Sequence, residues 1–450
     1  MKYYSTNAKA PLADLKKAVV KGLAEDRGLY MPERIEKLPQ AFFNDMKNMS
    51  FQDIAYNVAA NFFGEDVDAD ALQDLVFDTL SFDCPIVKVE ENIYSLELFH
   101  GPTLAFKDVG ARFMARLLQY FLRSGSVCSD SVAAHKTVNV LVATSGDTGS
   151  AVANGFLGVE GIHVYVLYPK GKVSPIQECQ FTTLGKNITA IEVDGVFDDC
   201  QALVKNAFMD EELNKHMMLT SANSINVARF LPQAFYYFNA VARLSALNLQ
   251  TSDIVMCVPS GNFGNICAAL FGHEMGLPIS RFIAANNAND VFYQYLQTGQ
   301  YNPKASVQTL ANAMDVGDPS NFARILNLYS KNGKLSAEET HKAITDLISG
   351  CTYSDEQIRE TMRQCYKETS YVLDPHGACG YRALKEQLRP GEIGVFCETA
   401  HPAKFKEKVD EILAADIEIP ERLQAFMRGQ KQSIPLSKEF EDFKEFLLRR

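Results

Sequence analysis

The sequence predicts an α/β protein with parallel sheets and an N-terminal region that is mainly helical. Short, continuously apolar runs alternate with helical stretches from about residue 86 onward, as in parallel sheets that are covered on both faces. Before that point the apolar residues follow the helical period. The chain has 450 residues, of which 47% are hydrophobic. It can therefore form about two or three domains, each with its own core.

The expected elements follow in chain order. The first helix is expected to begin near Pro11 and to end before Gly28, because proline fits the first turn of a helix and glycine often follows its end. Two more helical stretches follow at 54–63 and 71–79. The later elements are strand 138–143, helix 151–158, strand 162–168, strand 188–193, helix 200–208, helix 227–249, strand 254–259, strand 393–397 and helix 439–448.

Charge and composition exclude several classes of function. The chain has 44 basic and 55 acidic residues, a formal net charge of −11 and no basic block. Nucleic acid is not expected as a partner, because affinity for phosphate backbones depends on clustered Lys and Arg. No stretch reaches the roughly 20 apolar residues that cross a bilayer, and the first residues lack the apolar core of a signal peptide. We therefore expect a cytoplasmic protein that does not bind membranes.

Cysteine and glycine spacing exclude further classes. The ten cysteines are scattered, and no pair has the Cys-x-x-Cys spacing of a zinc or redox site. They are expected to be buried thiols in a reducing compartment, with no metal site. The glycine-rich turns differ in spacing from the Walker loop and from the dinucleotide fingerprint, which argues against an NAD-dependent enzyme.

Two strand-to-helix turns offer backbone N–H groups to an anion. The expected strand 254–259 is followed by Gly261-Asn262-Phe263-Gly264-Asn265 and then by a helical run. The two glycines let N–H groups converge, and the helix N-terminus adds partial positive charge, which suits a phosphate. The expected strand 138–143 is followed by Ser145-Gly146-Asp147-Thr148, which suits a carboxylate. The alternative is that both are ordinary turns or helix caps.

A lysine in apolar surroundings is a candidate nucleophile. Lys107 follows Leu104, Ala105 and Phe106. Partial loss of water would lower its pKa and favour the free amine that Schiff-base chemistry requires. The alternative is a surface lysine that pairs with Asp108. A second candidate, Thr399, follows the strand 393–397, where the ends of parallel strands reach ligands.

A loop-to-helix junction offers a second phosphate site. It brings together two amides, a hydroxyl and a guanidinium, a set that can bind a phosphate. Helix capping is again the alternative. The residues are Asn223, Ser224, Asn226 and Arg229.

In combination, these motifs resemble those of the threonine synthase family, whose members are pyridoxal phosphate enzymes of fold type II, the structural family of tryptophan synthase β. The resemblance implies two open, mostly parallel-sheet domains beside the N-terminal region: 1–90 as the mainly helical region, 91–225 as a smaller α/β domain with Lys107 and the substrate carboxylate loop, and 226–450 as a larger α/β domain with the cofactor phosphate loop. The segments that carry the resemblance cover almost the whole chain: 26–32, 101–108, 145–149, 261–265, 315–321 and 399–405.

The resemblance also implies roles for single residues. Pyridoxal 5'-phosphate would be bound covalently by Lys107, which would later transfer protons. The backbone of 261–265 would hold the cofactor phosphate, and Thr399 would hydrogen-bond the pyridine nitrogen. Asp147 would lie near the 3′-oxygen of the cofactor, where a carboxylate repels a phenolate unless the two share a proton. The substrate α-carboxylate would be bound by Ser145, Gly146 and Thr148.

The reaction of the family converts O-phospho-L-homoserine and water to L-threonine and phosphate by γ-elimination and β-addition of water, the last step of threonine biosynthesis. The substrate phosphate needs a site apart from that of the cofactor. The expected residues are Asn223, Ser224, Asn226, Arg229, Ser320, Asn321 and Arg324. The smaller domain is expected to close over the substrate, and the enzyme is expected to be a monomer or a homodimer.

Other functions fit part of the same pattern. A serine or threonine dehydratase, or a phospholyase, would use the same cofactor but eliminate ammonia. A metabolite-binding or scaffold protein could keep the fold without catalysis, although the intact Lys107 argues against it. The second phosphate site and the long N-terminal region favour the threonine synthase reaction over both.

Overall fold

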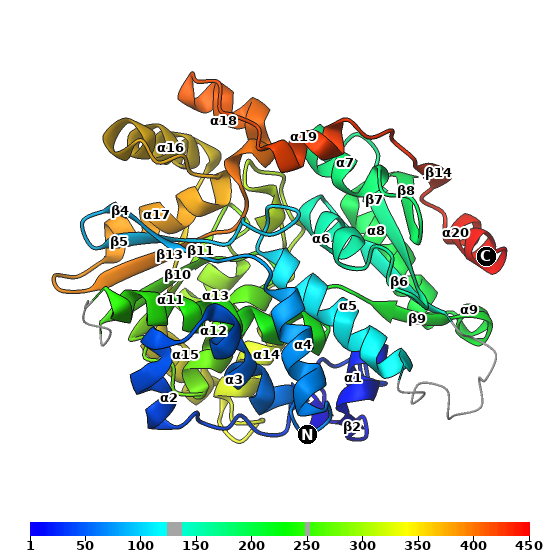
Figure 1. The fold of residues 1–450 in the computed structure, drawn as a ribbon, viewed down its shortest axis with the longest axis horizontal. Helices are drawn as coiled ribbons and strands as arrows, with labels where there is room; N and C mark the ends of the chain where they lie inside the picture. The colour runs from blue at the N-terminus through cyan, green and yellow to red at the C-terminus, as the bar shows by residue number, and fades with distance from the viewer. Residues whose placement is uncertain (124–136, 248–252) are drawn as a thin grey trace.

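The computed structural model describes residues 1–123, 137–247 and 253–450. Two large sheets lie side by side, and the helices of the N-terminal region lie below the larger sheet (Figure 1). A third, small antiparallel sheet has the order β2-β1-β3. Its strands are β1 (Lys2–Ser5), β2 (Ala13–Asp14) and β3 (Tyr30–Pro32).

The larger sheet has six strands in the order β12-β11-β10-β13-β5-β4. All neighbouring strands run parallel except the edge strand β4, which is antiparallel to β5. Apolar side chains on one face pack with α16, α17 and α18, and those on the other face pack with α11 and α12. The strands are β4 (Ile86–Glu90), β5 (Ile93–Glu97), β10 (Ile254–Pro259), β11 (Arg281–Asn286), β12 (Ile348–Thr352) and β13 (Ile393–Glu398).

The smaller sheet has five parallel strands in the order β14-β8-β7-β6-β9. Helices α8 and α20 pack on one face, and α5, α6 and α7 lie on the other side. Two sheets covered in this way confirm the predicted fold class. The strands are β6 (Val138–Ala143), β7 (Ile162–Pro169), β8 (Ile188–Asp194), β9 (Met218–Ser221) and β14 (Ile434–Ser437).

Most helices cover these sheets, while α3 packs on α11 and α4 on α5. The helices are α1 (Leu15–Lys21), α2 (Gln40–Asp45), α3 (Phe51–Phe63), α4 (Ala69–Thr79), α5 (Lys107–Arg123), α6 (Asp147–Gly155), α7 (Pro175–Thr182), α8 (Phe197–Met209), α9 (Glu211–His216), α10 (Val227–Phe230), α11 (Ala234–Ala246), α12 (Gly264–Glu274), α13 (Val291–Thr298), α14 (Phe322–Tyr329), α15 (Ala337–Leu347), α16 (Asp355–Thr369), α17 (Pro375–Gln387), α18 (Lys406–Leu413), α19 (Glu421–Met427) and α20 (Phe440–Leu448).

Two expected helices differ from those observed. The first begins at Leu15 rather than near Pro11, because Asp14 caps it by accepting a hydrogen bond from the backbone N–H of Lys17. The expected helix 227–249 is divided into α10 and α11 by a 3₁₀ turn that contains Pro232. Proline has no backbone N–H to donate, which accounts for the break. Residues 248 and 249 of that expected helix lie outside the described part of the chain.

The division of the chain at residues 90 and 225 stays a prediction, and strand pairing crosses it twice. Strand β5 pairs with β13, so the strand that precedes Lys107 belongs to the sheet of the later residues. Strand β14 pairs with β8, so a C-terminal segment completes the smaller sheet. Lys107 therefore follows a strand of the larger sheet and begins a helix that lies against the smaller one.

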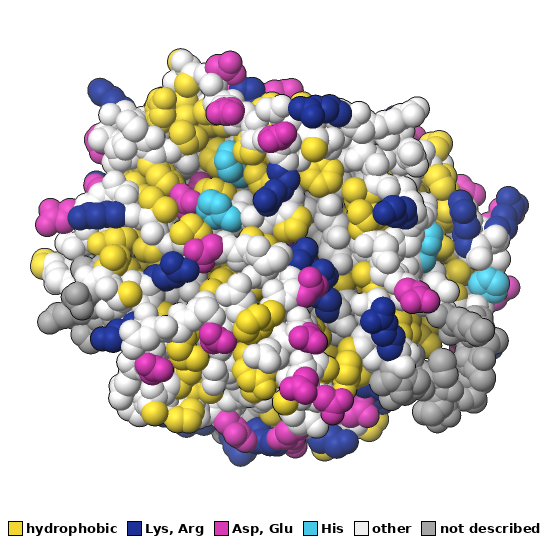
Figure 2. Space-filling model, viewed as in Figure 1, with side chains coloured by type: hydrophobic (Ala, Val, Ile, Leu, Met, Phe, Trp, Pro, Cys, Tyr) yellow, Lys and Arg dark blue, Asp and Glu magenta, His cyan; other side chains and the backbone are white. Residues whose placement is uncertain are grey.

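The remaining expectations concern cysteines, membrane spans, metal sites and surface charge. The described cysteines have free thiols and are buried, except Cys179, which is partly buried; Cys128 lies outside the described residues. No described helix is long and apolar enough to cross a membrane, and no His, Cys, Asp or Glu cluster suited to a metal occurs among the described residues. On the face in Figure 2, basic and acidic side chains are interspersed without a continuous basic patch.

Candidate active site

The turn that precedes Lys107 is tied to the segment that contains Thr399. The backbone N–H of Phe106 donates to the carbonyl of Thr399 at 2.9 Å, and that of His401 donates to the carbonyl of Leu104 at 3.0 Å. These bonds flank an antiparallel bridge between Ala105 and Ala400. Lys107 and Thr399, which are far apart in the sequence, therefore lie next to each other at the ends of neighbouring strands.

The amine of Lys107 has the surroundings that the sequence predicted. It donates no hydrogen bond to a described residue, and its Nζ lies 5.5 Å from the ring centroid of Phe106. Loss of water around it lowers the pKa of Lys107 to about 8, with Asp147 acting in the opposite direction and Lys404 and Arg229 adding to the decrease. A usable fraction of the free amine is thus present near neutral pH.

Asp108, the residue after Lys107, holds this turn in place. It does not pair with Lys107, which was the alternative interpretation of the sequence. Asp108 is buried and accepts hydrogen bonds from the backbone N–H of Thr103 at 2.8 Å and from its hydroxyl at 2.6 Å. Gly101 passes so close that a Cβ there would lie 2.4 Å from an oxygen of Asp108. The turn therefore closes around a buried carboxylate.

The loop 261–265 forms an anion site at the N-terminus of α12. Phe263 has a φ of +62°, in the left-handed region, and a Cβ on Gly261 would lie 2.6 Å from the carbonyl oxygen of Ala313. None of the backbone N–H groups of 261–265 donates a hydrogen bond to a described residue. Unpaired donors at a helix N-terminus fit a phosphate group.

The amide side chains of this loop hold its shape. Asn265 accepts from the hydroxyl of Ser260 at 2.8 Å and donates to the carbonyl of Pro259 at 2.8 Å. Asn262 donates to the hydroxyl of Ser224 at 2.7 Å and accepts from the backbone N–H of Ser320 at 2.7 Å. The loop thus offers backbone donors to a ligand, while the side chain of Asn262 connects it to Ser224 and Ser320.

A second group of unpaired donors lies at the N-terminus of α6. Gly146 has a φ of +148°, and a Cβ there would lie 2.6 Å from the side chain of Gln177. The backbone N–H groups of Ser145, Asp147 and Thr148 donate no hydrogen bond to a described residue. Their arrangement suits a carboxylate. The N–H of Gly146, which the sequence assigned to this site, donates instead to the hydroxyl of Thr144 at 2.9 Å.

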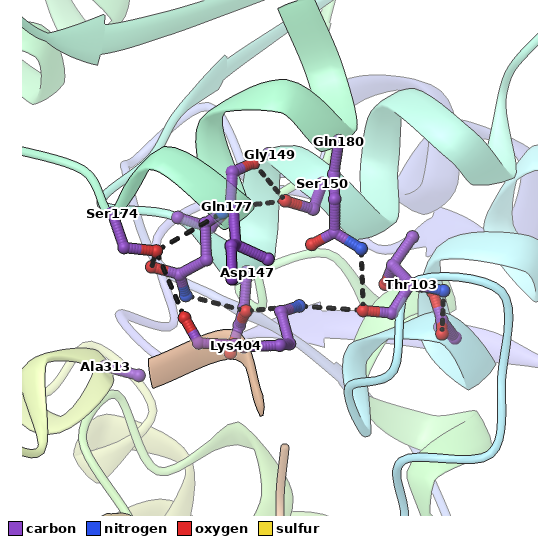
Figure 3. Close-up of polar contacts among 12 residues, drawn as sticks. Thr103, Asp147, Gly149, Ser150, Ser174, Gln177, Gln180, Ala313 and Lys404 are labelled. Carbon is purple, nitrogen blue, oxygen red and sulfur yellow. Dashed lines mark hydrogen bonds and ion pairs between the residues drawn. The ribbon is translucent and has the colours of Figure 1, made fainter. Parts of the chain in front are cut away.

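Asp147 itself is buried in an ion pair. One of its oxygens lies 2.6 Å from Nζ of Lys404 and accepts a hydrogen bond from Gln177 at 2.8 Å (Figure 3). Burial opposes its ionisation, but the charges of Lys404 and Lys107 lower the pKa of Asp147 to about 2. The carboxylate of Asp147 is therefore ionised, and its negative charge is balanced mainly by Lys404.

The predicted substrate-phosphate residues divide into two groups. Arg229 is buried and donates from one terminal nitrogen to the carbonyl of Ala222, while its Nε has no partner. The side-chain oxygen of Asn223 is also buried without a partner. Burial lowers the pKa of Arg229 to about 10. Unsatisfied buried groups of this kind are rare in folded proteins. The Nε–H of Arg229 is a donor that fits an anionic ligand, whereas the free oxygen of Asn223 is an acceptor.

The other group serves the fold. Asn226 caps α10 and donates to the carbonyl of Val19 at 2.8 Å, so its amide is fully engaged. Arg324 is buried and gives its five N–H groups to the carbonyls of Tyr30, Ser224 and Ile225 and to the side chain of Asn321. Protein groups use the hydrogen-bonding capacity of these two side chains, which favours a structural role for both over direct phosphate contact.

Sequence reasoning did not assign a role to Lys404, which lies among Ala403 and Phe405. The signal was available: Lys107 was selected because it follows apolar residues, and Lys404 has the same surroundings. Thr399, which was selected, is buried, and its hydroxyl has no partner among the described residues. It can therefore still bind a ligand atom.

Comparison with protein families identifies the class of enzyme. Residues 83–397, which include Lys107 and the loop 261–265, match the family described as pyridoxal-phosphate dependent enzyme. The free amine, the unpaired N–H groups of 261–265 and the free hydroxyl of Thr399 fit the aldehyde, the phosphate and the ring nitrogen of that cofactor. The protein is therefore a pyridoxal phosphate enzyme of fold type II.

The termini and the relatives identify the family within this class. Residues 2–80 match the threonine synthase N terminus and residues 377–447 the threonine synthase C-terminal region. Threonine synthase from Escherichia coli is 43% identical over 97% of this chain and 95% of its own, and that from Saccharomyces cerevisiae 36% identical over 92% and 89%. The chain belongs to the threonine synthase family, whose members are pyridoxal phosphate-dependent lyases.

Solved structures agree with this assignment. The crystal structure of threonine synthase from Escherichia coli superposes with a TM-score of 0.90 at 40% identity and covers 100% of both chains. The pyridoxal phosphate-bound threonine synthase from Brucella melitensis superposes with a TM-score of 0.91 at 33% identity, covering 100% of this chain and 99% of its own. The cofactor predicted from the sequence is thus confirmed.

Proposed function

We propose that this chain converts O-phospho-L-homoserine and water to L-threonine and phosphate, with Lys107 as the cofactor-binding and proton-transferring residue. The observation that carries the proposal is the pair of anion sites beside one free amine: the N–H groups of 261–265 and the unpaired Nε–H of the buried Arg229. A substrate with both an amino acid group and a phosphate needs such a second phosphate site.

Three parts of the site would hold the cofactor. Lys107 would bind its aldehyde carbon, the backbone of 261–265 would bind its phosphate, and the hydroxyl of Thr399 would hydrogen-bond the ring nitrogen. Bound pyridoxal phosphate supplies an electron-withdrawing group that stabilises negative charge at Cα of the amino acid. Because a hydroxyl cannot hold the ring nitrogen protonated as a carboxylate would, the surrounding dipoles must share in that stabilisation.

The substrate is bound at both ends. The unpaired N–H groups of Ser145, Asp147 and Thr148 bind its α-carboxylate at the N-terminus of α6, where Gly146 shapes the turn. Arg229 and the amide NH2 group of Asn223 bind its phosphate. The hydroxyls of Ser224 and Ser320 complete that site. Asn321 and Arg324 position this site without touching the phosphate. Asn321 donates to Ser224 at 3.2 Å, and Arg324 donates to Asn321 at 2.6 Å.

Proton transfer is the second task of Lys107. Its amine takes the proton that leaves Cα and, with a pKa near 8, can give one back at neutral pH. Overall, Cβ loses a proton, the phosphate leaves Cγ with the bonding electron pair, and Cγ gains a proton. Water then adds its hydroxyl group to Cβ, and its other proton goes to the phosphate. Closure of the smaller sheet and its helices over the substrate would exclude early water. The cytoplasmic location, the absence of nucleic acid or membrane partners and a monomer or homodimer belong to the same proposal.

A direct assay separates this reaction from that of a dehydratase or phospholyase. We expect purified protein with pyridoxal phosphate and O-phospho-L-homoserine to release phosphate and threonine in equal amounts. A dehydratase or phospholyase would instead release ammonia and a keto acid. Enzymatic quantification of phosphate, threonine and ammonia in one reaction distinguishes the two, and ammonia in place of threonine would reject the proposal.

Replacing Arg229 by alanine is expected to raise the KM for O-phospho-L-homoserine by about 10- to 100-fold, from the loss of a charge-assisted contact of roughly 1.5–3 kcal/mol. Steady-state kinetics measure the change. Arg243→Ala is a matched control, since Arg243 pairs with Asp83 at the surface. Equal KM values for the wild type and Arg229→Ala would remove Arg229 from the substrate site.

A further inference from the structure

A second lysine lies inside the site without a role in the reaction described above. Lys404 belongs to the short 3₁₀ helix Pro402–Phe405, which follows β13 and Thr399. Its side chain is completely buried, with 0% of its surface exposed. Lysine is seldom buried to this extent unless its charge is paired. The partners of Lys404 therefore indicate what it does.

These partners come from two other segments. The ammonium of Lys404 lies 2.6 Å from Asp147, the first residue of α6, and donates to the carbonyl of Thr103 at 2.8 Å. Thr103 lies in the turn that closes around Asp108 just before Lys107. Figure 3 shows Lys404 between these two acceptors. One ammonium thus connects the larger sheet, the carboxylate loop of the smaller sheet and the turn that carries Lys107.

Other side chains fix the same acceptors. Gln177 donates to the oxygen of Asp147 that pairs with Lys404, and Gln180 donates to the carbonyl of Thr103 at 3.0 Å. Both glutamines belong to α7. Ser174, the cap of that helix, donates to the carbonyl of Lys404 at 3.3 Å. Asp147, the carbonyl of Thr103 and Lys404 itself therefore each form a further hydrogen bond, to a residue in or next to α7.

Charge explains why the pair is needed. The cofactor carries a phosphate and a phenol that readily ionises, and the substrate carries a second phosphate and a carboxylate. A lone carboxylate at Asp147 would repel these groups at short range in a water-poor site. Paired with Lys404, it adds no net charge, yet it keeps its oxygens as hydrogen-bond acceptors.

We propose that Lys404 is a positioning residue of this active site, which neutralises Asp147 and holds it and the turn before Lys107 in their places. The inference rests on the proposed function, because it takes Lys107 as the residue that binds the cofactor. Nothing in the reaction requires Lys404 to touch the substrate. Its effect is expected to reach the chemistry through Asp147 and Lys107.

The proposal predicts opposite effects of two isosteric substitutions on Lys107 in cofactor-free protein. Burial, Lys404 and Arg229 lower the pKa of Lys107, and Asp147 raises it. Lys404→Met removes a lowering charge and leaves Asp147 uncompensated, so the pKa of Lys107 should rise by about one unit or more. Asp147→Asn removes the raising charge, so the pKa should fall. In the double variant it should lie between those of the two single variants.

The measurement is the pH dependence of acylation of Lys107, followed by peptide mass spectrometry. We expect a midpoint near pH 8 for the wild type, a higher one for Lys404→Met and a lower one for Asp147→Asn. Lys431→Met is the matched control: Lys431 also pairs with two carboxylates, Glu178 and Glu192, but outside the site. It should leave the midpoint of Lys107 unchanged.

A second measurement uses the affinity for pyridoxal phosphate. Lys404→Met should raise the Kd of the cofactor by about tenfold or more, because the uncompensated carboxylate repels it. Asp147→Asn/Lys404→Met should recover most of this loss, since the repelling charge is gone. A lysine that serves only the stability of the fold would lower the melting temperature of both variants without recovery in the second.

Two results would overturn the proposal. One is an unchanged Lys107 midpoint in Lys404→Met. The other is a cofactor Kd in the double variant as high as in Lys404→Met. If Lys404→Met does not fold, the acylation midpoint of Lys107 is compared between Asp147→Asn and the double variant. Equal midpoints in these two would show that Lys404 does not act on Lys107. The acylation experiment needs neither substrate nor turnover, so it stands even if the assay rejects the proposed reaction.

Discussion

Replacing Lys107 by alanine is expected to lower the rate of threonine formation by about 10³-fold or more. The variant loses both the amine that binds the cofactor and the group that moves the proton at Cα. The visible absorption of lysine-bound cofactor should disappear from the purified protein at the same time. Turnover and absorption spectra of the wild type and the variant, each with added pyridoxal phosphate, measure the two effects.

Two further variants show whether charge or chemistry is lost. Lys107→Arg keeps a cation but has no amine for the aldehyde, so it should be as inactive as Lys107→Ala. Lys47→Ala removes an exposed lysine outside the site and should retain full activity. Normal turnover in Lys107→Ala would contradict every role given to this residue.

Local sequence patterns predicted the strands that precede the two candidate anion sites. Strands β6 and β10 were placed at 138–143 and 254–259, the bounds that the structure has. A continuous apolar run followed by glycine and hydroxyl or amide residues indicates such a turn from neighbouring residues. Its final shape also depends on distant residues, as the bonds of Asn262 to Ser224 and Ser320 show. Lys107 could be selected for the same reason, because its apolar neighbours directly precede it.

Features that depend on distant segments could not be predicted in this way. Residues 2–5 form β1, which pairs with β3 near residue 31, yet four residues alone carry no helix or strand period. Strand β14 joins the smaller sheet through β8, which lies far earlier in the chain. The ion pair of Lys404 and Asp147 also joins two segments that are far apart in the sequence. Only the folded chain shows these pairings.

The substrate-phosphate residues show the same limit within one loop. Asn223, Asn226 and Arg229 all looked suitable, because a sequence shows donors but not how many of them the fold itself uses. In the structure the amide of Asn226 is fully engaged, whereas Arg229 and Asn223 keep unpaired atoms. Counting satisfied donors divides a group of similar residues into positioning and ligand-binding members.

Arg324 provides the sharpest test of this division. Arg324→Ala is expected to lower the free energy of unfolding by about 3 kcal/mol or more, because buried acceptors lose their donors at roughly 1–3 kcal/mol each. The acceptors are the carbonyls of Tyr30 and Ile225 and the side chain of Asn321. The guanidinium also lies over the ring of Phe230, with its central carbon 4.0 Å from the ring centroid, and loses that contact.

The effect should extend from stability to the cofactor. Arg324 holds Asn321, which donates to Ser224 and to the carbonyl of Asn262 in the loop 261–265. The Kd for pyridoxal phosphate should therefore rise together with the loss of stability. Urea unfolding of the cofactor-free protein and cofactor titration measure the two quantities. Arg324→Lys, which keeps the charge but has fewer donors, should lie between the wild type and Arg324→Ala.

The contrast with Arg229 makes the result decisive. Arg229→Ala is expected to change the KM for the phosphorylated substrate, whereas Arg324→Ala changes stability and cofactor affinity. As a control, Arg359→Ala, which removes a surface pair with Glu411, should stay within about 0.5 kcal/mol of the wild type. If Arg324→Ala unfolds at the wild-type urea concentration but raises the KM, then Arg324 contacts the substrate phosphate directly, as the sequence first indicated. In that case the hydrogen bonds to the carbonyls of Tyr30 and Ile225 do not hold the guanidinium in the substrate complex.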